Sequence, residues 1–264
     1  MGEEKRMAFA DFTKHPARYV KVRGLLLWHL LFSLPGLRRK TRENTGWKEL
    51  FESLNSFHDD FFRCLQVPDE IVAAMEIIER HAPRRILEIG TARGGTLFLF
   101  SRAAAPDAFL VSLDLAHGKY GGGYSAWKTH IFRRLLRDGQ RAEFVRGDSH
   151  EAASLDEVCQ HFKGEKLDLL FIDGDHTYAG VKQDYELYSP LVREGGLIIL
   201  HDIAKHPPQL QCEVDRFWNE VKGCFQSQEV IADRQQGWAG IGILNYSQAG
   251  LKSTAATQRL GQSG

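Results

Sequence analysis

From residue 85 onward, short apolar runs alternate with helical segments, and this alternation limits the fold more than any other feature of the chain. Strands are predicted over five ranges, at 85–89, 109–113, 143–146, 167–172 and 197–200. The spacing of apolar residues predicts helices between and after them, at 96–104, 124–136, 152–162, 178–192 and 213–221. Continuous apolar strands joined by helices are typical of a parallel sheet that is covered on both faces.

Two further strands complete the sheet that we expect. They lie near 229–232 and 241–244, and the short polar stretch 233–237 between them indicates an antiparallel addition at one edge. The prediction is an α/β fold with a Rossmann-like, seven-stranded, mostly parallel sheet, helices on both faces and an antiparallel edge strand.

The remaining residues flank this predicted domain. Residues 1–66 lack a regular strand pattern, and we expect them to form a helical N-terminal extension. Pro68-Asp69-Glu70 is a good helix start because proline and acidic residues favour the first turn, so the α/β domain should occupy 67–246. Residues 247–264 are rich in Ser, Gly, Gln and Thr, and we expect a disordered tail there.

Charge and cysteine content exclude some classes of partner and site. The chain has 264 residues with 34 Lys and Arg against 34 Asp and Glu, so it lacks the basic excess of a nucleic-acid-binding protein. Its cysteines show neither the CxxC nor the CxxH spacing of a zinc site, and they indicate reduced thiols in the cytoplasm. The four cysteines are Cys64, Cys159, Cys212 and Cys224.

The segment 20–40 combines an apolar stretch with flanking basic residues. Its apolar part, from Leu25 to Leu34, is too short to cross a bilayer. Trp28 and the nearby Lys and Arg residues suit a helix that lies at a membrane surface, which would make the protein peripherally membrane-associated. The alternative is a helix that packs on the α/β domain or on a second copy of the chain in a homodimer.

Polar residues follow the first three predicted strands at the point where each strand ends. The run RILEI, residues 85–89, leads into GTARGG, residues 90–95. Ligands of open α/β sheets bind outside the carboxyl ends of the strands. The glycine loop is not the dinucleotide-binding pattern GxGxxG, because Ala92 stands where that pattern requires glycine.

The pattern Glu88-x-Gly90-x-x-x-Gly94 resembles the first motif of class I S-adenosylmethionine (SAM) methyltransferases. Asp114 closes the second strand, where an acid can accept hydrogen bonds from ribose hydroxyls. Residues 147–149 close the third strand, where enzymes of the family bind the adenine. The resemblance therefore implies SAM as cofactor, with a binding set of Glu88, Gly90, Thr91, Gly94, Asp114, Asp148, Ser149 and Asp173.

The most specific part of the resemblance is FIDGDHTY, residues 171–178, followed by GGLIILHD, residues 195–202. These stretches are similar to cephalosporin-hydroxylase-like proteins and macrocin-type sugar O-methyltransferases. In metal-dependent members, acids at these two strand ends hold Mg²⁺, and a base three residues after the first acid takes the proton of the acceptor hydroxyl. Carried over by position, Asp173, His201 and Asp202 would bind the metal, and His176 would accept the proton next to Asp173.

One residue departs from the family pattern. Metal-dependent relatives present two oxygen ligands at the end of the fifth strand, whereas this chain has His201 before Asp202. Imidazole suits Mn²⁺, Fe²⁺ or Zn²⁺ better than Mg²⁺, which prefers oxygen. The expected ion is Mg²⁺ or, if His201 is a ligand, a softer ion such as Mn²⁺; the alternative is a metal-free site in which His201 contacts the substrate. Asp175 either contacts the substrate or caps the helix that follows.

The resemblance implies an O-methyltransferase that acts on a hydroxyl of a sugar, a glycan precursor or a natural product. Two alternatives keep the same fold. One is a cephalosporin-hydroxylase-like enzyme, and the other is a non-catalytic subunit that binds SAM as a scaffold. The acceptor site should involve residues 1–66, the glycine-rich stretch 117–124 and the loop 203–212.

Overall fold

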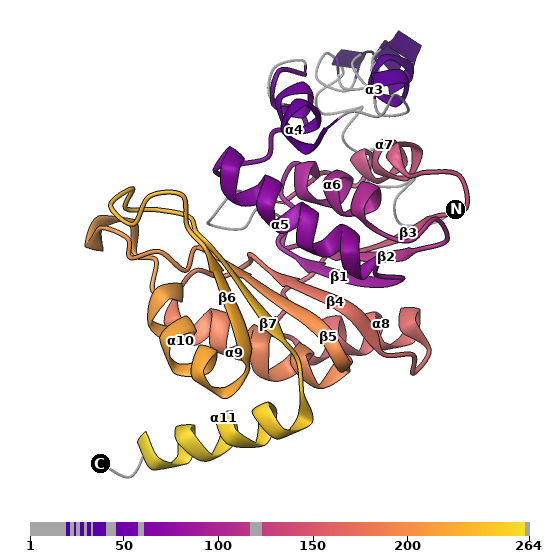
Figure 1. Cartoon of the computed structure of the whole chain (residues 1–264). Helices are drawn as coiled ribbons and strands as arrows, with labels where there is room; N and C mark the ends of the chain where they lie inside the picture. The colour runs from indigo at the N-terminus through magenta and orange to yellow at the C-terminus, as the bar shows by residue number, and fades with distance from the viewer. Residues whose placement is uncertain are drawn as a thin grey trace.

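A seven-stranded sheet forms the centre of the computed structural model (Figure 1). The structure describes residues 34–40, 46–57, 61–116 and 123–261, together with isolated positions between 20 and 32. The strand order is β3-β2-β1-β4-β5-β7-β6. The strands are β1 (Arg85–Ile89), β2 (Phe109–Leu113), β3 (Arg141–Val145), β4 (Leu167–Ile172), β5 (Val192–His201), β6 (Gln226–Val230) and β7 (Ile241–Asn245).

Strand directions confirm the predicted fold class. β1 pairs in parallel with β2 and β4, and the parallel pairs β2–β3 and β4–β5 extend the sheet on either side. β7 runs antiparallel to both β5 and β6. The first five strands follow the order of a doubly wound fold, in which the chain reverses direction across the sheet between β1 and β4. The carboxyl ends of β1 and β4 therefore flank the position where ligands of such sheets bind.

Helices cover both faces of the sheet, as Figure 1 shows. One face carries α5 (Pro68–His81), α6 (Gly95–Ala103) and α7 (Lys128–Leu135), and the other carries α8 (Ala152–Phe162), α9 (Tyr178–Tyr188) and α10 (Val214–Val221). Two separate apolar cores result. Phe100 of α6 packs edge-on against Phe171 of β4 with ring centroids 5.0 Å apart, and Tyr185 of α9 packs against Phe217 of α10 at 5.3 Å.

Two predicted helices are shorter in the structure, each for a local reason. α9 ends at Tyr188 instead of residue 192, because Pro190 lacks a backbone N–H and the chain continues as a single 3₁₀ turn, Ser189–Leu191. α7 begins at Lys128 instead of residue 124. Tyr124 is buried ahead of that helix, where its ring packs edge-on against Phe132 and Phe144.

The N-terminal extension contributes two helices to the described structure, α3 (Leu34–Lys40) and α4 (Trp47–Asn55). Leu37 and Leu54 are buried in the same apolar core as α5, α6 and α7. Much of the segment 20–40 lies outside the described residues, so the surface helix and the homodimer stay predictions. Within the described part of the chain, no helix has both the length and the apolar character needed to cross a membrane.

The C-terminal segment corrects one expectation. Residues within the tail that we expected to be disordered form the helix α11 (Gln248–Gly261). Thr254 is buried, and Gly250 packs so closely against Phe225 that a Cβ at position 250 would lie 2.4 Å from the ring. Composition alone suggested disorder, but the small residues of this segment instead allow close packing against the end of α10.

Candidate active site

The loop after β1 meets the end of β4 at the carboxyl edge of the sheet. The backbone N–H of Asp173 donates to the carbonyl oxygen of Ile89 at 2.8 Å. Gly90 has a φ of +88°, and a Cβ at this position would lie 1.9 Å from the carbonyl oxygen of Asp173. Only glycine fits this approach, which brings the proposed cofactor loop directly against the FIDGDHTY turn.

A buried chain of hydrogen bonds begins at Glu88. Thr91 Oγ1 donates to Glu88 Oε2 at 2.6 Å and lies 2.7 Å from Ser112 Oγ, which in turn lies 2.9 Å from the Tyr124 hydroxyl. Burial raises the pKa of Glu88 to about 8, although the Thr91 hydroxyl opposes this rise. Glu88 Oε1 is buried and has no hydrogen-bond partner among the described residues. A buried acceptor atom without a hydrogen-bond partner fits a site that binds a cationic ligand.

Asp114 lies at the end of β2 and faces the same loop. Its carboxylate accepts a hydrogen bond from the backbone N–H of Ala92, which has a φ of +46°. Burial raises the pKa of Asp114 to about 6, against the effect of the Ala92 N–H. The loop 90–95, which contains Thr91 and Gly94, thus lies next to Glu88 and Asp114. The resemblance implies this arrangement for a SAM site.

The residues after β3 make different contacts. Asp148 Oδ1 accepts from the backbone N–H of His150 at 2.9 Å, and the carbonyl oxygen of Ser149 accepts from the Tyr188 hydroxyl at 2.8 Å. His150 Nε2 lies 3.3 Å from Oδ1 of the fully buried Asp184. Among the described contacts, Asp148 and Ser149 therefore anchor the β3 loop on α9, and neither bonds to the β1 loop.

The ends of β4 and β5 bring two carboxylates and two imidazoles together. His201 Nδ1 lies 3.1 Å from Asp173 Oδ1 and 3.3 Å from Asp202 Oδ1. His176 bridges the same two acids, with Nδ1 3.0 Å from Asp202 Oδ2 and Nε2 3.5 Å from Asp173 Oδ1. Each of the four predicted residues of the reaction site thus lies within 3.5 Å of at least one other.

Mutual attraction sets the charge state of this cluster. Burial alone would raise the pKa values of Asp173 and Asp202, but the His201 imidazole beside both carboxylates lowers them. Burial alone would also lower the pKa values of His176 and His201, but the two carboxylates raise both. His201 Nε2 is buried without a hydrogen-bond partner among the described residues. The cluster therefore offers charged carboxylate oxygens, and an imidazole that releases its proton on metal binding adds a nitrogen donor, so these residues fit a divalent cation.

Asp202 owes its position to an unusual backbone and to a distant glutamate. Its φ is +63°, a left-handed conformation that aspartate tolerates better than most residues, and its Oδ1 accepts from the Ala239 N–H at 3.1 Å. The loop that carries Ala239 is held by Glu70 of α5, which is fully buried. Glu70 accepts from the backbone N–H groups of Ala232 at 2.9 Å and of Gly240 at 2.8 Å.

Several residues near the cluster were not predicted from the sequence. Gln66 Nε2 donates to Asp173 Oδ2 at 3.3 Å, and His206 Nε2 lies 3.2 Å from Asp202 Oδ1. Cys212 lies beside His176 and Asp202, although the spacing of the cysteines gave no indication of this. Local sequence motifs do not reveal these contacts, because the contacts join segments that are far apart in sequence.

Asp175 makes a local contact. Its Oδ1 accepts from the Thr177 N–H at 2.8 Å, and Thr177 in turn caps α9 by accepting from the Gly180 N–H at 3.0 Å. Asp175 thus supports the helix start without being the cap itself.

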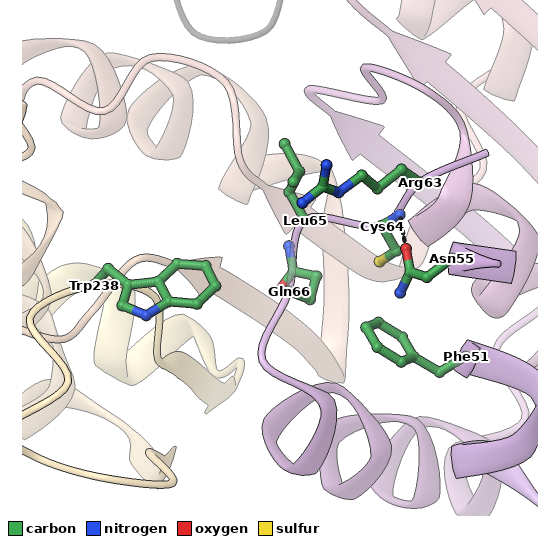
Figure 2. Close-up of a pocket in the computed structure, with 7 residues that line it drawn as sticks. All are labelled: Phe51, Asn55, Arg63, Cys64, Leu65, Gln66 and Trp238. Atoms are coloured by element: carbon green, nitrogen blue, oxygen red, sulfur yellow. Dashed lines mark hydrogen bonds between the residues drawn. The ribbon is translucent and has the colours of Figure 1, made fainter. Parts of the chain in front are cut away.

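A cavity of about 420 Å³ lies beside the cluster (Figure 2). Gln66 lines it and connects it to Asp173 through the hydrogen bond described above. Figure 2 shows Trp238 on one side and Phe51 and Asn55 on the other. The Trp238 side chain, from the loop between β6 and β7, is 42% exposed. The stretch 117–122, which we expected to border the acceptor, lies outside the described residues.

Comparisons with known proteins match part of this chain. Residues 87–203 match the family model of a methyltransferase domain. An uncharacterized protein of Sinorhizobium fredii is 28% identical over 131 residues, which is 48% of this chain and 14% of that protein. An uncharacterized protein of Acanthamoeba polyphaga mimivirus is 36% identical over 58 residues, or 21% of this chain and 26% of that protein. The chain thus matches only a minor part of the length of these curated relatives.

Solved structures extend the similarity in fold. The cofactor-bound protein Rv0187 from MTB has a TM-score of 0.50 at 18% identity, covering 84% of this chain and 95% of that chain. An O-methyltransferase from Bacillus cereus in complex with SAH has a TM-score of 0.48 at 17% identity, covering 83% and 96%. Residues 87–203 thus resemble a methyltransferase domain, and the α/β sheet of this chain has the fold of these solved structures.

Proposed function

We propose that this protein transfers the methyl group of SAM to a hydroxyl group of a small-molecule acceptor. The observation that carries the proposal is the cluster of Asp173, His176, His201 and Asp202 beside the Gly90 loop. It joins a proton acceptor and metal-binding donors to the loop that resembles a SAM site. The position between β1 and β4 is where ligands of doubly wound sheets bind.

Cofactor binding is assigned to the first two strand ends. Asp114 supplies negative charge near the loop 90–95, and the buried Glu88 Oε1 can accept a hydrogen bond. SAM, when bound, supplies an electrophilic methyl group on a sulfonium centre. Gly90 and Gly94, with φ values of +88° and +85°, allow the backbone to turn at the edge of this site. Asp148 and Ser149 are assigned to the adenine, with the Asp148 side chain partly exposed after β3.

His176 is assigned the role of proton acceptor. A hydroxyl is a weak nucleophile until it loses its proton, and histidine accepts protons near neutral pH. Asp173 and Asp202 hold the two ring nitrogens of His176 in place at 3.5 and 3.0 Å. A divalent ion held by Asp173, His201 and Asp202 would stabilise the acceptor alkoxide and offset the effect of the carboxylates on His176.

The cavity beside Gln66 supports an acceptor with both apolar and hydrogen-bonding faces, such as a sugar or a natural product. Trp238 offers an exposed aromatic face, and Asn55 and Arg63 contribute polar groups to the lining. Its volume of about 420 Å³ is within the usual range for small-molecule sites. Gln66 lines the cavity and donates to Asp173, so an acceptor bound there would lie near the cluster.

The test combines a base variant with a matched histidine control. His176→Gln should lower kcat/KM by about 100- to 10,000-fold, because general-base catalysis contributes on that order. The probes are a panel of monosaccharides and phenolic compounds, and formation of SAH is measured. SAM affinity, measured by calorimetry, should stay unchanged. His161→Gln, on the outer side of α8, should keep full activity.

Two results would favour the alternatives. A chain that binds SAM but methylates no acceptor, with or without Mg²⁺ or Mn²⁺, would support the scaffold subunit. Stoichiometric iron after aerobic purification, without methyl transfer, would support the cephalosporin-hydroxylase-like enzyme.

A further inference from the structure

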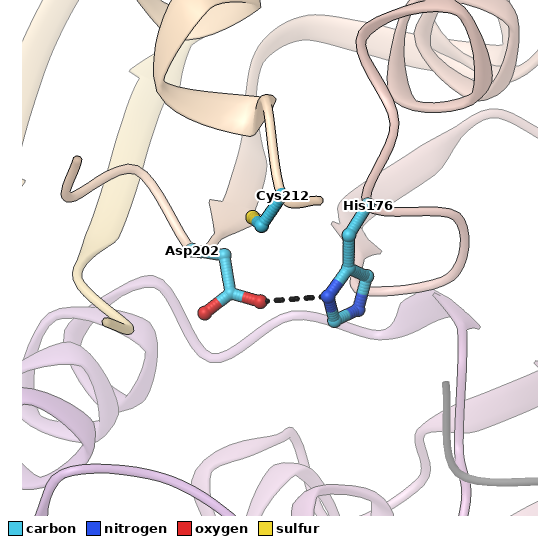
Figure 3. Close-up of side chains that lie close together, drawn as sticks. All are labelled: His176, Asp202 and Cys212. Atoms are coloured by element: carbon cyan, nitrogen blue, oxygen red, sulfur yellow. Dashed lines mark ion pairs between the residues drawn. The ribbon is translucent and has the colours of Figure 1, made fainter. Parts of the chain in front are cut away.

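Three donor atoms of different chemistry converge on one side of the cluster. They belong to His176 in the turn after β4, to Asp202 at the end of β5, and to Cys212 two residues before α10. The donor atoms all lie within 4.8 Å of one another, and His176 Nδ1 is 3.0 Å from Asp202 Oδ2. Figure 3 shows the imidazole directed at the carboxylate, with the Cys212 thiol beside them.

The backbone holds these donors in place without any bound ligand. The Glu213 N–H donates to the carbonyl oxygen of His176 at 2.8 Å, which ties the Cys212 segment to the turn that carries His176. Asp202 Oδ1 is occupied by the Ala239 N–H, so Oδ2 faces His176. Gln211, with a φ of +50°, turns the chain immediately before Cys212. The site is therefore assembled by contacts among three separate segments.

The donor set selects a particular class of ion. A thiolate, an imidazole and a carboxylate are ligands of Zn²⁺ and Co²⁺, whereas Mg²⁺ prefers oxygen donors throughout. Three protein ligands with an open fourth position are typical of zinc sites that bind water or substrate. The His176 side chain is 20% exposed and Cys212 is half-buried, so an ion can reach them from solvent.

The other ring nitrogen of His176 supports the same assignment. His176 Nε2 lies 3.5 Å from Asp173 Oδ1, so the two ring nitrogens of His176 face two different carboxylates. Histidine ligands of metals usually donate their second N–H to such a carboxylate, which fixes the orientation of the ring. Asp173 would thus be a positioning residue for this ion, in addition to its role in the first cluster.

We propose that His176 Nδ1, the Asp202 carboxylate and Cys212 Sγ form a binding site for a thiophilic divalent ion of the Zn²⁺ class. This site differs from the cluster of Asp173, His201 and Asp202 in its thiolate ligand and shares only Asp202 with it. One consequence rests on the proposed function. A His176 Nδ1 atom bound to the ion cannot accept a proton, so Zn²⁺ should inhibit methyl transfer.

The experiment uses Co²⁺ as a spectroscopic probe, added to the full chain after treatment with a chelator. One ion per chain should bind and give the near-ultraviolet charge-transfer band of a cobalt–thiolate bond, and Zn²⁺ should displace it. Cys212→Ser should abolish this band and weaken Zn²⁺ binding by more than about 100-fold. Cys159→Ser, which changes a thiol on α8 away from the cluster, should give the spectrum of the unchanged protein.

A second variant separates the two sites that share Asp202. Asp173→Asn should keep the cobalt–thiolate band and weaken Co²⁺ binding by about 10- to 100-fold, because Asp173 orients the His176 ring but is not a ligand of this ion. Thermal melting of each variant verifies that it folds. No thiolate band in the unchanged protein, or a band that persists in Cys212→Ser, would overturn the proposal.

Inhibition is measured as the ratio of methyl-transfer rates with and without Zn²⁺ within each variant. Zn²⁺ should lower the methyl-transfer rate of the unchanged protein at least about tenfold, and it should leave the rate of Cys212→Ser nearly the same. The cobalt spectrum needs neither SAM nor an acceptor, so it reads the site even if methyl transfer fails. If the unchanged protein binds SAM but gives no cobalt–thiolate band, the proposed metal site is refuted and the proposed function is not.

Discussion

At the scale of single residues, the site depends on side chains that meet because the sheet brings strand ends together. The meeting of Asp173, His176, His201 and Asp202 could be predicted, because two motifs, FIDGDHTY and GGLIILHD, place these residues at the ends of neighbouring strands. Glu70 could not, since it lies at the start of α5 and reaches the loop 231–240 only in the folded chain. No spacing in the sequence encodes such a contact.

The proximity of Cys212 to the cluster could not be predicted for a related reason. The absence of paired cysteine motifs argued against a zinc site, but that argument covers only sites built from neighbouring ligands. In the structure, His176, Asp202 and Cys212 are drawn from three segments. Metal sites assembled at the edge of a sheet leave no local signature, and here only the placement of β4, β5 and α10 reveals the donor set.

Gly90 permits a sharp test of how the cofactor loop meets β4. Gly90→Ala should destabilise the protein by about 3 kcal/mol, because the Cβ would collide with the Asp173 carbonyl and the φ of +88° is strained for alanine. Gly164→Ala is the matched control, since Gly164 has a φ of +80° and open space around it. That variant should lose only about 1 kcal/mol.

Urea denaturation measures both free energies of unfolding. Equal losses in Gly90→Ala and Gly164→Ala would show that the loop after β1 does not press against the end of β4.

At the scale of secondary-structure elements, apolar runs located the strands well. β1, β2 and β4 have the predicted bounds, because each is a buried run flanked by polar turns. β5 extends from Val192 to His201 and not from 197 to 200. Its first residues, VREGG, lack an apolar pattern, so the sequence did not indicate that they belong to the strand. The end of α9 at Tyr188 was missed because helical spacing continued through Pro190.

The connection between β3 and α9 predicts a dependence of stability on pH. The buried Asp184 carboxylate, which lies 3.3 Å from His150 Nε2, raises the pKa of His150 to about 9, although burial of the imidazole opposes this rise. A histidine whose pKa is raised on folding stabilises the protein fully below its unfolded pKa of about 6.5. This contribution should disappear as the pH rises from about 6.5 through about 9.

Asp184→Asn tests this pair, since the amide keeps the shape of the side chain and removes its charge. The free energy of unfolding, measured between pH 6 and pH 10, should fall less with rising pH in Asp184→Asn than in the unchanged protein. Parallel pH profiles for the two proteins would contradict the pairing of His150 with Asp184.

At the scale of the whole molecule, the class of fold and the position of the site could be predicted from the alternation of strands and helices. A parallel sheet with one reversal of strand order has one edge where ligands bind, and the polar strand ends lie along it. The helix α11 could not be predicted from composition, whereas a helical extension with packing of the segment 20–40 on the domain was one of the alternatives. The exposed side chains of Leu27, Leu31 and Phe32 keep a membrane or dimer contact as a proposal for this segment.

The central claim is that the loop after β1 and the end of β2 bind SAM, and calorimetric titration of the full chain with SAM tests it most directly. The account predicts one molecule of SAM per chain and an affinity at least about tenfold weaker in Asp114→Ala, because a charged hydrogen bond contributes about 1.5–3 kcal/mol. Asp107→Ala, which removes an exposed partner of Arg84, should bind SAM like the unchanged protein. No heat of binding with SAM in the unchanged protein, with or without Mg²⁺ or Mn²⁺, would contradict the account.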